Sequence, residues 1–270
     1  MRFIYLETNN NIMPKSLLKG LQIREENNVS AVYARLLRNV VYPIVQDSPE
    51  TCGNTCLLSL APSEKYLEKA YKDLIMDKDK WLVYVDGKKT GMDPYTLASL
   101  ARTYYKRLLR YYYNVSAYVD KSEIESIYNG KNTRNGVILD GEALKEDEKR
   151  LLDSGVALFN RKLSLDEIFE KVENGAHVIM RLPGLVGHWV VIDGGLNVVF
   201  SGAGGKKIVP VVMDPLEGKY IYDEKINDYI AHIVLMFAGF GSNETFTAII
   251  AEPPVQKKVT YLLRKDSYPG

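Results

Sequence analysis

Cysteine and histidine are scarce in this 270-residue chain, which contains two cysteines and three histidines. Cys52 and Cys56 lie four residues apart, and the histidines lie far from one another. A disulfide framework needs several cysteine pairs, and a structural zinc site needs four Cys or His ligands at characteristic spacing. The sequence provides neither, so we expect two free thiols, no metal and no cofactor.

An excess of charge of one sign is also lacking, because 35 Lys and Arg are balanced by 34 Asp and Glu, which gives a net charge of +1. Such a chain has no general attraction for nucleic acid or for an anionic membrane, and we expect neither as a partner. No apolar run approaches the length of a membrane-spanning helix, and the apolar stretch at the N-terminus is too short for a signal peptide. We therefore expect a cytoplasmic protein.

Apolar residues follow helical spacing in the first half of the chain and strand-like runs in the second half. The expected helices cover residues 52–60, 63–76 and 94–111, and a fourth begins with a capping box formed by Ser164 and Glu167. The expected strands of the second half cover residues 177–182, 189–193, 196–200, 208–213, 233–237 and 247–251. Helices followed by strands indicate an α+β fold.

Composition also suggests how the chain is organised. Residues 1–39 are predicted to be an N-terminal extension, with a short strand at 3–6 and helix in part of 15–39. Residues 40–270 are predicted to form the main domain, whose size and 46% hydrophobic content suffice for one core. Within it, residues 114–162 are charged and contain Asn-Gly and Asp-Gly turn signals, which indicate an insertion or lid.

Cys52 stands where a helix is expected to begin. Pro43 and its β-branched neighbours favour an extended chain up to Gln46, and Thr51 is a suitable N-cap. A thiol attacks a carbonyl only as the thiolate, and a free cysteine is mostly protonated near pH 7. Unpaired N–H groups at a helix start and a nearby imidazolium both stabilise the anion. We therefore interpret Cys52 as a candidate nucleophile.

His188 is the candidate base, because it opens the apolar run of residues 189–193 after Gly187. Its second ring nitrogen needs a carboxylate or an amide to fix the tautomer and the ring angle. Asp214 ends an apolar run just before a proline, so it is able to point toward a neighbouring strand that carries His188. Asp193 is the rival, but five residues along an ideal strand it faces the opposite side from His188.

The remaining candidates would bind the substrate or stabilise its transition state. Hydrogen-bond donors lower the barrier when charge moves onto the substrate oxygen, and the backbone N–H of Cys52 and the side-chain amide of Gln46 are suitable donors. We expect Gly53 to leave room for a substrate backbone and Trp189 to shield the imidazole from water. Both are therefore predicted substrate-binding residues.

These residues share their order with a known family. The motif Gln-x5-Cys-Gly-x2-Cys-Leu from Gln46, the motif His-Trp-Val-Val-Ile-Asp-Gly from His188 and the Asp-Pro pair at Asp214 resemble the double-glycine peptidases. Those papain-like domains trim leader peptides from bacteriocins. The resemblance covers residues 40–251 in outline, but the intervals from Cys52 to His188 and from His188 to Asp214 are longer, and no transporter segment follows.

The resemblance implies a papain-like cysteine peptidase fold, in which N-terminal helices, including the catalytic helix, pack on an antiparallel sheet. It implies peptide-bond hydrolysis of a peptide or protein, with Cys52 as nucleophile, His188 as base, Asp214 as orienter and Gln46 in the oxyanion hole. The substrate sequence and the oligomeric state are left open.

Two other functions use the same residues. Transglutaminase-like and arylamine acetyltransferase-like enzymes carry the triad in this order and pass the acyl group to an amine, and an inactive homologue would only bind a peptide. Outside the candidate site, Cys56, His177 and His232 are interpreted as packing residues. The tyrosine- and arginine-rich segment 104–113 is interpreted as a helix with a buried aromatic face rather than a surface for base stacking.

Overall fold

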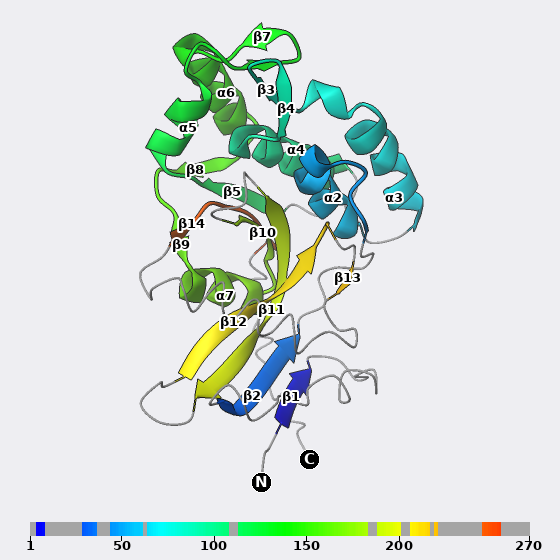
Figure 1. Cartoon of the computed structure of the whole chain (residues 1–270), viewed down its shortest axis with the longest axis vertical. Coiled ribbons are helices and arrows are strands. Elements are labelled where there is room, and N and C mark those ends of the chain that lie inside the picture. The colour runs from blue at the N-terminus through cyan, green and yellow to red at the C-terminus, as the bar shows by residue number, and fades with distance from the viewer. Residues whose placement is uncertain are drawn as a thin grey trace, which may run out of the picture.

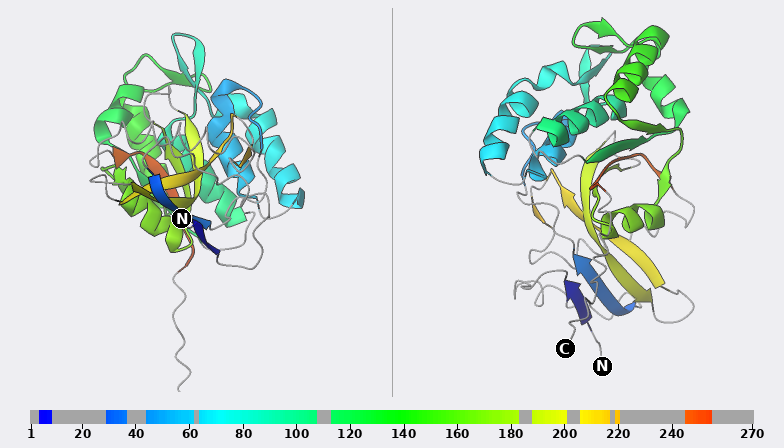
Figure 2. Two further views of the ribbon diagram at one scale, coloured as in Figure 1. Left: turned by 60° about the horizontal axis from the view of Figure 1, so that its bottom comes forward. Right: turned by 180° about the vertical axis from the view of Figure 1, so that it is seen from behind.

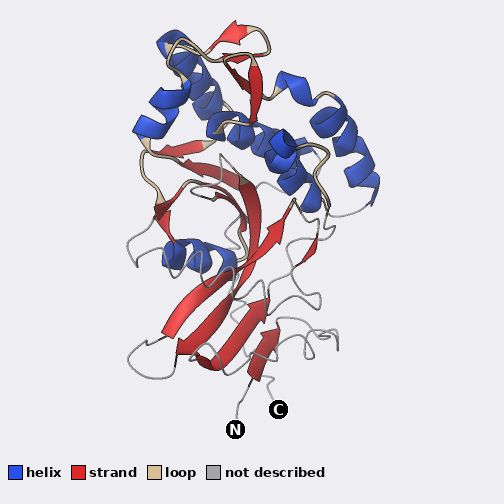
Figure 3. Cartoon of the chain, viewed as in Figure 1, coloured by secondary structure: helices blue, strands red, loops and turns tan. Residues whose placement is uncertain are grey.

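The computed structural model describes residues 4–8, 29–36, 44–61, 64–107, 113–182, 188–200, 206–216, 219–220 and 245–254, and the statements below concern these residues. They form a mixed α+β fold (Figures 1 and 3). Most helices gather at one end of the molecule, and the long strands run from there toward the opposite end (Figure 1). Among the described helices, none is both long and apolar enough to cross a bilayer.

The main sheet contains nine strands in the order β1-β2-β11-β10-β15-β5-β8, with β12 added beside β11 and β13 beside β12. Their bounds are β1 Ile4–Thr8, β2 Val29–Leu36, β5 Asn114–Tyr118, β8 Ala157–Phe159, β10 His177–Arg181, β11 Trp189–Phe200, β12 Lys206–Asp214, β13 Lys219–Tyr220 and β15 Ala248–Glu252. Most neighbours are antiparallel, as the resemblance implies, but β1 with β2 and β5 with β8 are parallel. The sheet is therefore mixed at these two pairs.

Strand β11 organises this sheet because it is long enough to pair with three others. Its first residues, 189–192, pair with β10, and residues 194–200 pair with β2. On its other edge it pairs with β12, with a register shift between Ile192 and Gly194. The sequence predicted two separate strands here, and the structure joins them into one.

Six α-helices accompany the sheet in the described part of the chain. They are α2 Cys52–Ser59, α3 Glu64–Tyr71, α4 Pro94–Arg107, α5 Lys121–Ile127, α6 Gly141–Asp153 and α7 Leu165–Glu173. The helix predicted over residues 63–76 is α3 followed by a π-helical turn, Lys72–Met76. The core lies where α2 and α4 pack on β5, β11 and β15. Helix α7 packs on β10, β11 and β12, and Figure 2 shows it from behind.

Local signals set several helix starts as expected. Asp93 accepts hydrogen bonds from the backbone N–H groups of Tyr95 and Thr96, which caps α4 just before Pro94. Ser164 and Glu167 form the predicted capping box of α7. Each motif lies within four residues of the helix it begins, so tertiary packing is not needed to specify it.

Two smaller sheets complete the described fold. One has the order β4-β3-β6-β7, with bounds Lys88–Gly91, Val83–Val85, Thr133–Arg134 and Val137–Ile138. The other pairs β9, Leu163–Ser164, with β14, Thr245–Phe246. Asn135 and Gly136 turn the hairpin between β6 and β7 with positive φ angles, as the Asn-Gly signal predicted.

The N-terminal extension differs in part from its prediction. The strand predicted at residues 3–6 is present as β1. Residues 29–36 were predicted to lie in a partly helical segment, but they form strand β2, which is antiparallel to residues 194–200 of β11. This part of the extension belongs to the main sheet, so the boundary at residue 39 does not separate two units. Partners more than 150 residues away decide its conformation, and a local sequence pattern does not contain them.

The predicted insertion at 114–162 also begins inside the sheet. Strand β5 lies between β15 and β8, and four of its five residues are buried. The charged, glycine-punctuated part lies beyond it, in α5, β6, β7 and α6. The predicted strand at 233–237 and His232 lie outside the described residues.

Candidate active site

Cys52 is the first residue of α2, as the sequence predicted, and its side chain is only 3% exposed. A 3-10 turn, Pro49–Thr51, leads directly into the helix. The hydroxyl of Thr51 donates to the carbonyl of Ser48 and accepts from its N–H, so Thr51 closes this turn and makes no side-chain cap to α2. No capping side chain therefore occupies the first backbone N–H groups of α2.

His188 and Asp214 are brought together from neighbouring strands. His188 immediately precedes β11, Asp214 is the last residue of β12, and the ladder between the strands pairs Val191 with Met213. The His188 Nε2 and Asp214 Oδ1 atoms are 2.7 Å apart. Asp214 Oδ1 also accepts a hydrogen bond of 2.9 Å from the backbone N–H of Leu216. The turn after β12 therefore fixes the carboxylate, and the carboxylate fixes the ring.

The imidazole of His188 lies between this carboxylate and the sulfur of Cys52. Burial by itself would lower the pKa of His188, but hydrogen bonds to Asp214 and to Cys52, together with the charges of both groups, raise it to about 9. Because Nε2 faces Asp214, Nδ1 is the nitrogen left to face Cys52. The ring is therefore an imidazolium at neutral pH, with an acidic group on each side.

The sequence predicted space for a substrate backbone at Gly53 and a shield for the imidazole in Trp189, and both residues are buried where α2 meets β11. Trp189 is fully buried, and its indole Nε1 donates to the carbonyl of Met92 at 3.1 Å. A Cβ atom on Gly53 would lie 3.3 Å from Trp189 Cδ1 and 3.5 Å from a methyl of Leu97. Glycine at position 53 thus lets α2 approach β11 and α4 closely, and the space expected for a substrate backbone is filled by these side chains.

Gln46 lies beside the end of β12. Its backbone N–H donates to the carbonyl of Pro215 at 2.8 Å, so it neighbours the residue that follows Asp214. Its side-chain Oε1 is buried and has no hydrogen-bond partner within the described residues. The chain segment that carries Gln46 is therefore attached to the same turn that holds Asp214.

Sequence reasoning treated Cys56 only as a core residue and assigned no role to Met92. Cys56 is fully buried, and burial is the main reason why its pKa is raised. Its Sγ lies 3.3 Å from the carbonyl oxygen of Trp189. The spacing of four residues was the available signal, since it places both cysteines on one face of a helix.

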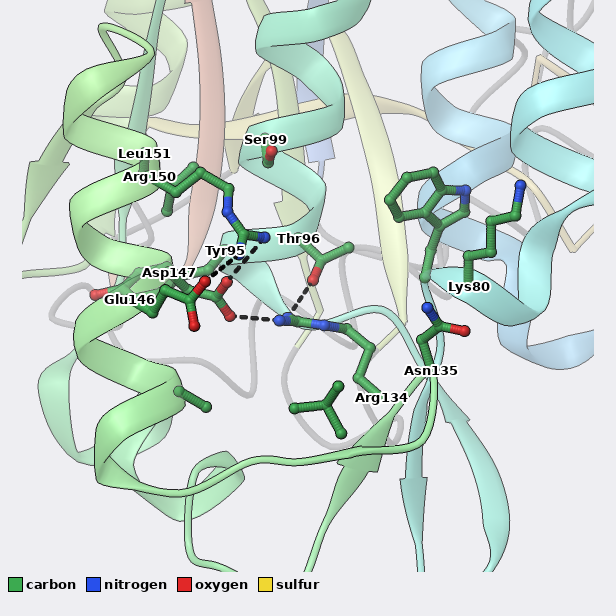
Figure 4. Close-up of a pocket in the computed structure, with 13 residues that line it drawn as sticks. Lys80, Tyr95, Thr96, Ser99, Arg134, Asn135, Glu146, Asp147, Arg150 and Leu151 are labelled. Atoms are coloured by element: carbon green, nitrogen blue, oxygen red, sulfur yellow. Dashed lines mark hydrogen bonds and ion pairs between the residues drawn. The ribbon is translucent and has the colours of Figure 1, made fainter.

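A polar cavity of about 280 Å³ lies apart from these residues, between α4, α6 and the hairpin of β6 and β7 (Figure 4). Arg134 crosses it and bonds to Asp147, as Figure 4 shows, and it also bonds to Asp93 at 3.0 Å. Arg150 in turn contacts Asp147 and Glu146. The acidic groups of this cavity are thus paired with arginine, which suits a structural cluster better than a reactive site.

Within the described residues, no three His, Cys, Asp or Glu side chains converge as a metal site would require. No protein-family model, curated protein or solved structure matches the chain. The chemistry of the Cys52, His188 and Asp214 side chains is therefore the basis for assigning a function.

Proposed function

We propose that this protein is a papain-like cysteine peptidase that hydrolyses peptide bonds through Cys52, His188 and Asp214. The supporting observation is the arrangement of His188, which hydrogen-bonds to the Asp214 carboxylate on one side and to the Cys52 side chain on the other. The packing of α2 against β11 agrees with the expected contact between a nucleophile helix and a sheet. The substrate class is a peptide or protein.

The first half of the reaction forms an acyl-enzyme on Cys52. The sulfur of Cys52, as thiolate, attacks the carbonyl carbon, and the electron pair of the C=O bond moves to oxygen. The backbone N–H of Cys52 and the side-chain amide of Gln46 are the proposed donors to that oxyanion. When the C–N bond breaks, the His188 imidazolium gives its proton to the departing amine, which leaves a thioester on Cys52.

The second half of the reaction reverses these roles. His188, now neutral, accepts a proton from water as the water oxygen attacks the thioester carbon. The C–S bond breaks, the carboxylic acid leaves, and the thiolate and imidazolium are restored. Asp214 holds the ring in place and stabilises its positive charge in both halves.

Labelling with a peptide-based electrophile tests the nucleophile directly. We expect intact-mass analysis to show one adduct at neutral pH, and peptide mapping to place it on Cys52. Cys56 is the internal control, because a buried thiol with a raised pKa should remain unlabelled in the folded protein. Labelling of Cys52 no faster than a thiol in a short unstructured peptide would contradict the proposal.

Digestion of a peptide library tests the reaction. The intact protein should produce new peptide termini that the Cys52→Ala variant does not produce. Addition of a primary amine separates hydrolysis from acyl transfer, because transfer would give amide products in place of free carboxylates.

A further inference from the structure

We propose that Cys56 is a positioning residue that holds the nucleophile through the backbone of Trp189. This inference rests on the proposed role of Cys52 as nucleophile, but it is tested below without any peptidase assay. Two backbone groups of Trp189 bond to the two cysteines of α2. The N–H of Trp189 donates to Cys52 Sγ at 3.4 Å, and the carbonyl of Trp189 accepts from Cys56 Sγ at 3.3 Å.

The strand pairing explains why these groups are available to α2. In an antiparallel ladder, the N–H and C=O of one residue point to the same edge, and successive residues alternate between the two edges. The carbonyl of His188 accepts at 2.8 Å from the N–H of Leu182, which directly follows β10. The ladder with β12 begins only at Val191. At Trp189, therefore, the two thiols of α2 take the place of a neighbouring strand.

Trp189 itself is held firmly. It is fully buried, its indole donates to Met92, and Gly53 lets α2 pack against its ring. Cys56 is one turn from Cys52 and fully buried as well, and its raised pKa keeps the thiol protonated so that it acts as a donor. The bond from Cys56 to the Trp189 carbonyl fixes the position of α2 along β11, one residue from His188.

The same contact has a chemical consequence for Cys52. A backbone N–H that donates to sulfur favours the thiolate over the thiol. If Cys56 releases the Trp189 carbonyl, α2 is free to shift along β11, and the Cys52 sulfur moves relative to the Trp189 N–H. The second cysteine is thus expected to influence the ionisation and the orientation of the first without contacting substrate.

Trp189 can be observed selectively, because the protein contains only two tryptophans. Labelling with ¹⁵N-tryptophan gives two backbone amide signals, and a Trp81→Phe variant identifies the signal of Trp189. We expect alkylation of Cys52 to shift the Trp189 amide signal and to leave that of Trp81 in place. A Trp189 amide signal unchanged by alkylation would overturn the proposed bond.

Substitutions of Cys56 then test the positioning role. Cys56→Ala removes the donor and should shift the Trp189 amide signal, slow alkylation of Cys52 at pH 7 about three- to tenfold, and move its pH profile toward higher pH. Cys56→Ser retains a donor and should restore most of the wild-type rate. If Cys56→Ala is too unstable to fold, Cys56→Val, which fills the same site without a donor, should show the same shift of the Trp189 amide signal and the same slower alkylation of Cys52.

Ser59→Ala is the matched control. Ser59 is equally buried on α2 and donates to the carbonyl of Thr55, but it has no bond to Trp189. It should lower stability without moving the Trp189 amide signal or the pH profile of Cys52. Identical profiles for the wild type, Cys56→Ala and Ser59→Ala would show that Cys56 only fills the core. The two proposals fail in different ways. If Cys52 of the wild type is alkylated slowly but Cys56→Ala still shifts the Trp189 amide signal, the peptidase proposal is contradicted and the Cys56 bond is supported.

Discussion

His177 is the first residue of β10 and His188 immediately precedes β11, the antiparallel neighbour of β10, yet their surroundings shift their pKa values in opposite directions. Hydrogen bonds to Asp214 and Cys52 outweigh burial at His188 and raise its pKa to about 9. Burial lowers the pKa of His177 to about 4. One histidine is therefore charged at neutral pH and the other is neutral, although neither is well exposed.

The difference comes from the partner on the ring. His177 Nδ1 is 2.7 Å from the phenol oxygen of Tyr105, and the ring of Tyr113 lies beside it. Burial raises the pKa of Tyr105, so this phenol carries no negative charge to compensate a protonated imidazole. Asp214 supplies such a charge to His188. A histidine in an apolar strand is thus reactive or structural according to a residue that lies far away in the sequence.

Removal of the carboxylate beside His188 should have the largest effect. Asp214→Asn is expected to reduce peptide hydrolysis at least about a hundredfold, because the amide neither stabilises the imidazolium nor holds the correct tautomer. Steady-state rates on a cleaved library peptide measure this loss. Asp193→Asn is the control, since Asp193 was the rival orienter, and an equal loss in this variant would contradict the assignment of Asp214.

Asp214→Asn should also remove a dependence of stability on pH. A histidine whose pKa is raised by folding stabilises the protein fully below its unfolded value near 6.5, and this contribution is lost as the pH rises through about 9. Urea unfolding at pH 6.5 and pH 9 should therefore show a smaller difference in the variant than in the wild type.

His177 should make stability depend on pH in the opposite direction. Its folded pKa lies below its unfolded value, so the unfolded chain binds a proton that the native protein does not bind between pH 6.5 and 4. Stability should fall by about 2–3 kcal/mol from this group as the pH is lowered from 7 to 4.5. His177→Asn keeps a polar atom near the position of Nδ1 but does not titrate. Its free energy of unfolding in urea should therefore decrease less than that of the wild type between pH 7 and 4.5. If the free energy of unfolding decreases equally in the variant and the wild type as the pH is lowered, the His177 ring is solvated in the folded protein.

Tyr105→Phe should have the smallest effect. It removes the hydrogen bond to His177 while it retains the buried ring, and we expect a loss of about 1 kcal/mol in urea unfolding at pH 7. The rate of Cys52 alkylation should be unchanged, because Tyr105 has no part in the candidate active site. A change in that rate would mean that the two histidine environments are coupled through β10 and β11.

Short-range signals in the sequence predicted the parts of the fold that short-range contacts determine. The cap of α4 at Asp93 and the capping box of α7 follow from neighbouring residues, whereas α2 begins at Cys52 as predicted but without the side-chain cap expected from Thr51. Asp214 was preferred over Asp193 from strand alternation, and the structure places Asp214 on His188. These predictions needed only the periodicity of a strand and the chemistry of a helix terminus.

The sequence could not reveal features that depend on remote partners. Strand β2 is specified by β11, and β5 is specified by β15, so both were assigned to peripheral segments. Gly53 was read as space for a substrate because glycine indicates a close approach but not the group that approaches. The bonds of Trp189 to both cysteines likewise require the register between a helix and a strand, which no local pattern encodes.

The register shift between Ile192 and Gly194 divides β11 into two parts, which share β12 on one edge and have different neighbours on the other. The part that begins beside His188 is aligned by β10, and the part beyond the shift is aligned by β2. A slip of one residue in the outer part would turn its side chains to the other face of the sheet, but the irregularity at 193 is able to absorb that slip before it reaches Trp189. Evolution could therefore lengthen, shorten or replace the N-terminal strands while the distance between sulfur and imidazole stays the same.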